Sequence, residues 1–200
     1  MNILNLYGGI GGNRKLWGDN HKIVCIENNP DIANVYHDLF PKDKVVVADA
    51  HQYLLENYQE YDFIWSSPPC PTHSDIRRCG VDAGQYEAQY PAMELYQEII
   101  LLKHFAKCKW VIENVKPYYE PLIHGHLIER HLFWSNFHIS DFKTADNRRH
   151  DKITGGKEIY GFDLNKYTVD NKRAILRNMV NPELGLHVLN ESTKEQQVLL

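Results

Sequence analysis

The run ILNLYGGIGG, residues 3–12, passes from a short apolar strand into a turn that is rich in glycine. Glycine permits positive φ angles, and missing side chains let backbone N–H groups approach a ligand at the start of the next helix. Dinucleotides and S-adenosylmethionine both bind at turns of this kind, and a tight turn without a ligand is the alternative. We expect a nucleoside-containing ligand to be bound by Tyr7, Gly8, Gly9, Ile10, Gly11 and Gly12.

Short apolar runs alternate with helical patterns along much of the chain. Strands are predicted at Ile3–Tyr7, Lys22–Ile26, Lys44–Val47, Tyr61–Trp65, Lys109–Ile112 and His131–Phe137. Helices are predicted at Asp31–Leu39, Asp49–Tyr58 and Ala92–Ala106, and Asn29-Pro30 supplies a cap and a first-turn proline for the first of them. This alternation predicts an α/β fold with a doubly wound, mostly parallel sheet, in which ligands bind at the carboxyl ends of the strands.

The composition fits one compact domain, since 43% of the 200 residues are hydrophobic and 24% are charged. Within it we expect residues 1–140 to form a catalytic and cofactor-binding core and residues 141–172 to form a small irregular insert. Residues 173–200 should return to the core. The helix from Pro182 through Leu189 is expected to pack back toward the first strand and close the cofactor pocket.

The charge is unevenly distributed. A formal net charge of −4 argues against an indiscriminate polyanion binder. Residues 121–180 nevertheless hold ten Lys and Arg against seven Asp and Glu, and five of the eleven histidines. A nucleic-acid surface is therefore expected in this later stretch and not elsewhere.

The four cysteines, Cys25, Cys70, Cys79 and Cys108, show neither the close pairs of a zinc site nor the density of a disulfide scaffold. This spacing is typical of a reducing compartment. The chain begins directly with a strand-like run, without a basic segment or cleavage site, and has no long apolar stretch. We expect a cytoplasmic protein that is not exported and does not span a membrane.

Acidic residues follow the second and third predicted strands. Glu27-Asn28 lies where an acidic group can accept hydrogen bonds from ribose hydroxyls. Asp49-Ala50 lies where a carboxylate could reach an adenine amine, although Asp49 would also serve as a helix N-cap.

A thiol and a carboxyl group follow the next two predicted strands. Cys70 ends the segment Ser67-Pro68-Pro69-Cys70, and a nucleophilic role would require a nearby cation or oriented N–H groups. The alternative, a small buried hydrophobe, fits Cys25 and Cys108 better. Glu113 ends a strongly apolar run, so we expect its carboxyl group to keep its proton, or else to be a structural hydrogen-bond partner.

Taken together, Asn5–Gly12, Glu27, Asp49, Ser67–Cys70 and Glu113-Asn114-Val115 resemble, in order and spacing, the motifs of DNA (cytosine-5) methyltransferases. The resemblance extends to Ile128–Trp134, which is similar to the family's arginine motif, and to Arg177–Pro182, which is similar to its final Asn-x-Val-x-Pro motif. The short form of the chain is similar to compact enzymes encoded by phages and prophages.

This resemblance implies a Rossmann-like S-adenosylmethionine-dependent methyltransferase fold with a very small target-recognition insert. It implies S-adenosylmethionine as cofactor, S-adenosylhomocysteine as product, and double-stranded DNA with a flipped cytosine as partner, in a bacterial or phage-infected cell. Cys70 would attack carbon 6 of the base, Glu113 would hold the base, and Arg130 would steady it. Pro68, Asn178 and Val180 would join the cofactor-binding residues. No metal is expected, because no further ligand completes His124-x-His126 with His131.

The DNA contacts implied by the resemblance are distributed over two segments. Residues 71–90 are expected to be mobile and to help trap the base. The candidate nucleic-acid-binding residues are Thr72, Ser74, Arg77, Arg78, Arg148, Arg149 and Lys152, the last three in the insert, where an ordinary solvated loop is the alternative. Pro71-Thr72 stands where the family usually has glutamine, and Ile128 where it often has a second arginine. A monomer is expected, with a dimer as the alternative because the insert is small.

Three other functions stay open on the sequence. A related enzyme would methylate cytosine in RNA, such as tRNA. A catalytically silent paralogue would bind DNA or cofactor without turnover. A nicotinamide-dependent oxidoreductase would use the same glycine turn but would leave the combination of Cys70 and Glu113 unexplained.

Overall fold

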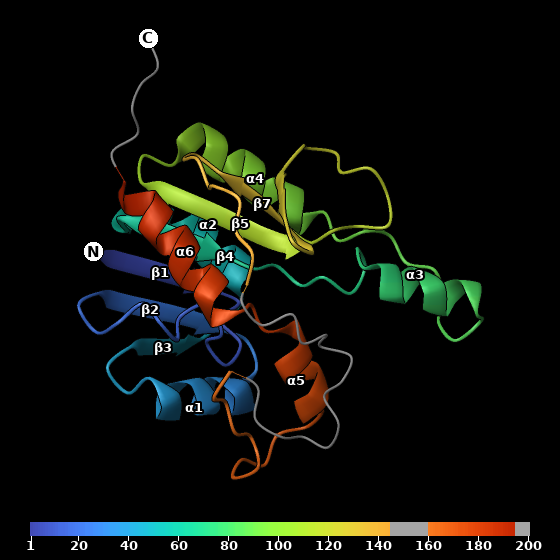
Figure 1. The fold of residues 1–200 in the computed structure, drawn as a ribbon, viewed down its shortest axis with the longest axis horizontal. Coiled ribbons are helices and arrows are strands. Elements are labelled where there is room, and N and C mark those ends of the chain that lie inside the picture. Colours follow the sequence, from blue (N-terminus) through green and yellow to red (C-terminus); the bar gives the residue numbers. More distant parts are fainter. Residues whose placement is uncertain (145–159, 195–200) are drawn as a thin grey trace.

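The structure of the chain is a computed structural model that describes residues 1–144 and 160–194 (Figure 1). Seven strands form one sheet in the order β3-β2-β1-β4-β5-β7-β6. The strands are β1 (Asn2–Leu6), β2 (Lys22–Glu27), β3 (Lys44–Val47), β4 (Phe63–Ser66), β5 (Lys109–Val115), β6 (His126–Ile128) and β7 (His131–Ser135). Strands β1 to β5 are parallel, and β7 runs antiparallel to both of its neighbours.

Helices cover both faces of this sheet. The helices of the described chain are α1 (Pro30–Leu39), α2 (Ala50–Asn57), α3 (Asp75–Asp82), α4 (Glu94–Phe105), α5 (Lys172–Asn178) and α6 (Pro182–Thr193), with a short 3₁₀ helix, η1 (Tyr58–Glu60). Side chains of α2 and α4 pack on one face, and side chains of α6 pack on the other. The predicted α/β fold with a doubly wound, mostly parallel sheet is confirmed.

Side chains alternate between the two faces along each strand, as the pleat of a sheet requires. The face under α6 contains Ile3, Phe63 and Val111. The face under α2 and α4 contains Leu4, Ile64 and Ile112. The sheet is buried on both faces, which explains why its strands read as nearly continuous apolar runs.

The predicted start of the first helix is confirmed. The side-chain oxygen of Asn29 accepts hydrogen bonds from the backbone N–H groups of Asp31 (2.9 Å) and Ile32 (3.2 Å), and Pro30 is the first helical residue. Asp49 caps α2 in the same way, because its Oδ1 accepts from the N–H of Gln52 (2.8 Å). These caps satisfy N–H groups that have no partner within the helix.

Several element boundaries differ from the predictions. Strand β1 ends at Leu6 because Tyr7 has a φ of 54°, which takes the backbone out of the strand. The fourth strand begins later than predicted, at Phe63, and extends to Ser66. Strand β7 ends at Ser135, whose Oγ donates to the carbonyl of Phe137 (2.6 Å). Strand β6 and helix α5 were not predicted.

Residues 71–90 contain a helix where the sequence predicted a mobile segment. The Ser74 side chain caps α3 by accepting from the N–H of Arg77 (3.3 Å). Thr72 Oγ1 accepts from the N–H of Ala92 (2.9 Å), which ties the end of the segment to its beginning. Figure 1 shows α3 set apart from the sheet. These local hydrogen bonds give the segment a defined shape.

Helix α6 returns to the first strand, as the sequence predicted. Leu184 and Val188 pack in one apolar cluster with Ile3 of β1, and Figure 1 shows α6 crossing this face of the sheet. The indole Nε1 of Trp17 donates to the carbonyl of Gly185 (3.0 Å). The close approach at Gly185 lets the helix lie directly against the segment that follows the glycine turn.

Residues 160–171 contain no helix or strand, and they pack beside α1. Phe162 and Leu164 are buried in a cluster with Val35, and Lys166 forms an ion pair with Asp38 (2.9 Å). The predicted insert residues Arg148, Arg149 and Lys152 lie outside the described residues. Among the helices that the structure describes, none has the length and apolar character needed to span a membrane.

We expect Gly185→Ala to destabilise the chain, although alanine in an exposed helix is normally more stable than glycine by about 1 kcal/mol. An added Cβ would lie 2.4 Å from the carbonyl oxygen of Asn13. The free energy of unfolding, measured by urea denaturation, should fall by about 1–3 kcal/mol, the usual cost of overpacking. Asn190→Ala, at an exposed position of α6, is the control and should change it by less than about 0.5 kcal/mol. Equal stabilities of the two variants would contradict this packing.

Candidate active site

The glycine turn after β1 is held by the acid that ends β2. Gly9 and Gly11 have positive φ angles of 54° and 81°. One Glu27 oxygen accepts from the N–H of Gly9 (3.0 Å), and the other accepts from the N–H of Asn29 (2.9 Å). Glu27 therefore lies beside the turn, as predicted, and holds it to the start of α1, while Asn28 is exposed.

Three of the four glycines are required by packing against the protein itself. A Cβ at Gly8 would lie 2.2 Å from the sulfur of Cys25, and one at Gly11 would lie 2.3 Å from the ring of Phe40. A Cβ at Gly12 would lie 2.0 Å from the Met179 side chain. At Gly9 nothing lies within 4 Å. Of these four positions, Gly9 is therefore the one that leaves open space for a ligand.

Of the other predicted cofactor residues, some pack against the glycine turn or α2, and others are exposed. The carbonyl oxygen of Val180 would lie 2.5 Å from a Cβ at Gly12, so this segment forms one side of the turn. Asn178 is exposed. Asp49 uses one oxygen to cap α2, which was the alternative to adenine binding, and Ala50 is buried beside it.

The glycine turn is also held by a buried carboxylate on α4, Glu98, which the sequence patterns did not indicate. Glu98 is 1% exposed and accepts hydrogen bonds from the Tyr7 hydroxyl (2.6 Å) and the Ser66 hydroxyl (2.6 Å). His51 Nδ1 lies 3.1 Å from the same carboxylate. Burial and the charge of Glu98 raise the pKa of Tyr7, so its hydroxyl stays a donor. The network links the glycine turn to the end of β4.

Cys70 lies on a loop that is attached to the neighbouring strand. The side-chain amide of Asn114, in β5, donates to the carbonyl of Pro68 (2.9 Å). The Cys70 carbonyl accepts from the N–H groups of His73 (3.0 Å) and Ser74 (3.1 Å). Cys70 itself is half-buried, unlike the fully buried Cys25. The loop is thus fixed on both sides of the thiol.

Glu113 is 5% exposed and has a partner for each carboxylate oxygen. Ser67 Oγ donates to Oε2 (2.8 Å), and its own oxygen accepts from the Trp65 indole (2.8 Å). His131 Nδ1 is hydrogen-bonded to Oε1. These bonds bring together the thiol loop, the carboxylate and the start of β7 at the carboxyl ends of the parallel strands.

The protonation of Glu113 differs from the sequence prediction. Burial raises the pKa of this carboxyl group, but the charge and hydrogen bond of His131, the hydroxyl of Ser67 and the charge of Arg130 outweigh it. The resulting pKa lies below the ordinary value, so the group is ionised at neutral pH. The expectation that Glu113 keeps its proton was wrong, because it considered burial without the partners.

The pKa of the Cys70 thiol lies above its ordinary value. Burial is the main cause, and the negative charge of Glu113 adds to it. The backbone of the loop and the charges of Arg130 and Arg177 act in the opposite direction. The thiol is therefore the favoured form in this structure, and anything that neutralises Glu113 would favour the thiolate.

Arg130 and His131 act on Cys70 and Glu113 in different ways. The exposed Arg130 donates to the carbonyl of Arg177 (3.2 Å) and acts on Cys70 and Glu113 through its charge. The residue that contacts Glu113 is His131, which the sequence analysis considered only as a metal ligand. Among the described residues, no group of three His, Cys, Asp or Glu side chains is arranged to hold a metal ion.

The predicted nucleic-acid contacts on residues 71–90 have intramolecular partners. Thr72 and Ser74 form the local hydrogen bonds described above. Arg77 donates to the carbonyl of Glu87 (3.1 Å). Arg78 is exposed and forms an ion pair with Asp82 (2.9 Å). A phosphate would have to compete with these partners.

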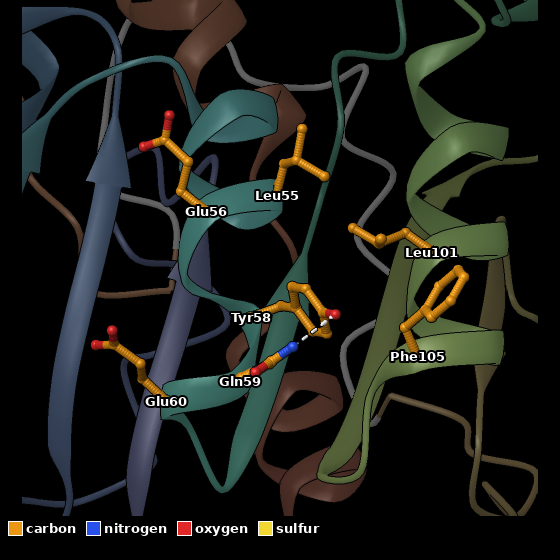
Figure 2. A pocket seen from close by; sticks show the side chains of 7 residues that line it. All are labelled: Leu55, Glu56, Tyr58, Gln59, Glu60, Leu101 and Phe105. Carbon is orange, nitrogen blue, oxygen red and sulfur yellow. Dashed lines mark hydrogen bonds between the residues drawn. The ribbon is translucent and has the colours of Figure 1, made fainter.

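A pocket of about 530 Å³ lies away from these residues, between α2, η1 and α4. Figure 2 shows Leu55 and Tyr58 on one side and Leu101 and Phe105 on the other. It lies near the starts of β4 and β5, opposite the edge that contains Cys70, and none of the predicted site residues lines it. We place the candidate active site at the carboxyl ends of the strands, where the thiol, the carboxylate and the glycine turn meet.

The model of one protein family, the C-5 cytosine-specific DNA methylases, matches residues 1–121 of the chain. Among curated proteins, none matches the chain significantly.

Solved structures that are similar to the chain include three from different organisms. A hypothetical protein of Thermus thermophilus is 14% identical, with a TM-score of 0.46 over 67% of this chain and 73% of that chain. A DNMT2 mutant of Spodoptera frugiperda is 26% identical, with a TM-score of 0.38 over 57% and 35%. A putative prophage-encoded DNA modification methyltransferase of Escherichia coli is 18% identical, with a TM-score of 0.39 over 60% and 33%. The chain spans about a third of the length of the latter two.

We expect Glu113→Gln to reduce the dependence of stability on acid pH. The pKa of Glu113 is lowered by folding, so its contribution is present above the unfolded pKa and is lost as the pH falls through the folded pKa. The variant lacks this contribution, and its free energy of unfolding should fall less steeply from about pH 5 to about pH 3. Denaturation series at several pH values measure the slope.

The matched control for this series is Glu60→Gln, which replaces an exposed glutamate. It should keep the slope of the parent chain. If Glu113→Gln also keeps that slope, Glu113 is not ionised by its partners in the folded chain.

Proposed function

The chain belongs to the C-5 cytosine-specific DNA methylase family, and we propose that it transfers a methyl group from S-adenosylmethionine to carbon 5 of cytosine in DNA. As a member of a methyltransferase family, the chain is an enzyme. It has the Rossmann-like fold that the sequence predicted. The observation that carries the proposal is the junction of the thiol loop and the acid strand. The side-chain amide of Asn114 donates to the carbonyl of Pro68 (2.9 Å), and these residues stand one after Glu113 and two before Cys70 in the sequence.

Carbon 5 of cytosine is too weak a nucleophile to take a methyl group directly, so covalent assistance is required. In the proposed reaction, the Cys70 thiolate adds to carbon 6 while Glu113 interacts with ring nitrogen 3 and the exocyclic amine. Carbon 5 then attacks the methyl group of the donor. Loss of the carbon 5 proton expels the thiolate and restores the ring. Since carbon 5 is inaccessible inside a stacked duplex, the cytosine must be flipped out, at a cost of a few kcal/mol.

Electrostatics around Cys70 support this order of events. The charge of Glu113 disfavours the thiolate, and the charges of Arg130 and Arg177 favour it. Hydrogen bonding of a base to Glu113, or protonation of Glu113, would weaken the unfavourable contribution. Arrival of the base would therefore activate the thiol, and in its absence the cysteine stays largely unreactive.

We propose that the glycine turn binds S-adenosylmethionine, the methyl donor and the source of the product S-adenosylhomocysteine. Gly9 fits this role because it combines a positive φ angle with open space. Glu27 lies beside it and can accept from ribose hydroxyls, and Asp49 has an oxygen available for the adenine amine. Tyr7, Ile10 and Pro68 would complete the donor site, with Val180 behind the turn.

DNA would be bound mainly by its backbone, with few residues left to read its sequence. Among the described residues of the insert, 160–171 pack beside α1, and Thr144 is hydrogen-bonded to Glu129 (2.8 Å), so few of them remain for base contacts. We propose that Arg77 and Arg78 on the α3 segment contact phosphates, together with Arg148, Arg149 and Lys152, which lie outside the described residues. A short or relaxed target site follows from this.

DNA that contains 5-fluorocytosine should become covalently attached to Cys70, because fluorine cannot leave as the proton does. Cys70→Ala should abolish the adduct, as seen by denaturing gel electrophoresis and peptide mass spectrometry. Cys79→Ala, which replaces the exposed cysteine of α3, is the matched control and should retain it.

An adduct located on Cys79 would contradict the assignment of the nucleophile. Tritium transfer from labelled donor to DNA and to tRNA separates the two substrate classes. Transfer to tRNA alone would replace the DNA proposal by the RNA alternative, and binding without transfer to either would identify a silent paralogue.

Gly9→Ala should raise the Kd for S-adenosylhomocysteine by at least about tenfold, because a Cβ would occupy the open space beside the turn and oppose the φ of 54°. Isothermal titration calorimetry measures the change. Gly18→Ala is the matched control, since Gly18 also has a positive φ (73°) and open surroundings but lies outside the turn. Equal affinities of the two variants would exclude Gly9 from the donor site.

A further inference from the structure

The contact between His131 and Glu113 follows from the antiparallel pairing of β5 and β7. Glu113 is opposite Phe133, and Val115 is opposite His131. His131 and Glu113 are therefore diagonal neighbours, and the alternation of side chains places them on the same face. His131 is 5% exposed, and its ring packs against that of Phe133 with centroids 6.5 Å apart. The imidazole has a fixed position beside the carboxylate.

This arrangement occupies both oxygens of Glu113 from within the protein. Ser67 donates to Oε2, and His131 Nδ1 is bonded to Oε1. Since the carboxyl group is ionised in this setting, it has no proton of its own to give. Addition of a thiolate to carbon 6 nevertheless drives an electron pair toward ring nitrogen 3, which then requires a proton. The proton must reach Glu113 from a neighbour.

The groups that face Glu113 and Cys70 differ in their ability to supply that proton. A serine hydroxyl such as that of Ser67 is not acidic at neutral pH. The guanidinium groups of Arg130, before β7, and Arg177, on α5, are not deprotonated in proteins. The Cys70 thiol loses its proton before it can attack. An imidazole can hold a proton and give it to a hydrogen-bonded partner, and Nδ1 of His131 already contacts the carboxylate, which suits His131 to the task.

We propose that His131 is the positioning residue that supplies Glu113 with the proton for ring nitrogen 3, an inference that rests on the proposed function. As Sγ of Cys70 bonds to carbon 6, the carbon 5–carbon 6 π pair becomes the carbon 4–carbon 5 double bond, and the carbon 4–nitrogen 3 π pair moves to nitrogen 3. Nδ1 of the imidazolium passes its proton to Glu113, and the carboxyl group donates a proton to nitrogen 3, which leaves a neutral imidazole and a carboxylate. After methyl transfer, a water molecule takes the carbon 5 proton, the carbon–hydrogen pair forms the carbon 5–carbon 6 double bond, and the carbon 6–sulfur pair leaves with Cys70 as thiolate. Nitrogen 3 returns its proton by the same route.

The thiol and the hydrogen-bonded pair of His131 and Glu113 then respond to pH in opposite senses. Raising the pH forms the Cys70 thiolate and accelerates the reaction, whereas it removes the proton that the pair passes to the base and slows it. The rate of single-turnover methyl transfer should therefore be bell-shaped in pH. In His131→Asn, which keeps a neutral amide near the carboxylate, the falling limb should disappear. The rate at the optimum of the parent enzyme should fall by about 10²-fold or more.

The matched control is His126→Asn, which replaces an exposed histidine of the adjacent strand β6 that is paired with Asp141 (3.2 Å). It should keep the bell-shaped profile and the rate. The KM for DNA and the Kd for S-adenosylhomocysteine distinguish the proposed role of His131 from a merely structural one. Both should stay within about threefold in His131→Asn while kcat falls.

Coupling between the two residues gives a second readout. In the Glu113→Gln background the proton acceptor is gone, so adding His131→Asn should lower the remaining rate by less than about twofold. Multiplicative losses would show that His131 acts independently of Glu113 and would overturn the proposal. A falling limb that persists in His131→Asn would overturn it as well.

The same assays distinguish this inference from the proposed function. If the parent chain transfers methyl groups to DNA and His131→Asn keeps its pH profile, the role of His131 is wrong and the proposed function stands. If the folded parent chain binds S-adenosylhomocysteine but transfers no methyl group, both are overturned.

Discussion

Ser66 and Ser67 follow each other at the end of β4, so their side chains point to opposite faces of the sheet. Ser66 donates to Glu98 (2.6 Å), and Ser67 donates to Glu113 (2.8 Å). Each carboxylate is almost fully buried, where a charge is stable only among hydrogen-bond donors. A shift of this strand end by one residue would deprive both acids of a partner. Ser66 thus joins the end of β4 to the carboxylate that also binds Tyr7 of the glycine turn, and Ser67 joins it to the acid on β5.

Much of this arrangement could be predicted from the sequence, because parallel strands bring their carboxyl ends to one edge. That rule predicts that Glu27, Cys70 and Glu113 all lie at the carboxyl ends of the strands. The Asn29-Pro30 cap fixed the start of the first helix for a local reason, the satisfaction of free N–H groups. Such features depend on neighbours in the sequence or on a general property of the fold.

What could not be predicted depends on partners from distant segments. Glu98 lies within an apolar helical pattern, and nothing local indicates that it supports the glycine turn. The ionisation of Glu113 depends on His131, whose contact arises from the register of an antiparallel strand pair. Gly8 and Gly12 suggested ligand contacts, but their close neighbours belong to Cys25 and Met179. Register and packing are settled by the tertiary structure, so sequence patterns carry little information about them.

The segment that packs against the glycine turn comes from a distant part of the chain. Met179 and Gly185 pack against Gly12 and Asn13 respectively. The Trp17 indole donates to the carbonyl of Gly185, more than a hundred and sixty residues later in the sequence. During translation, the apolar face of the sheet under α6 therefore emerges from the ribosome long before its cover. Such a nascent chain would present a surface that chaperones recognise and that proteases can attack. Its survival in the cell would depend on how soon α6 is synthesised and covers this face.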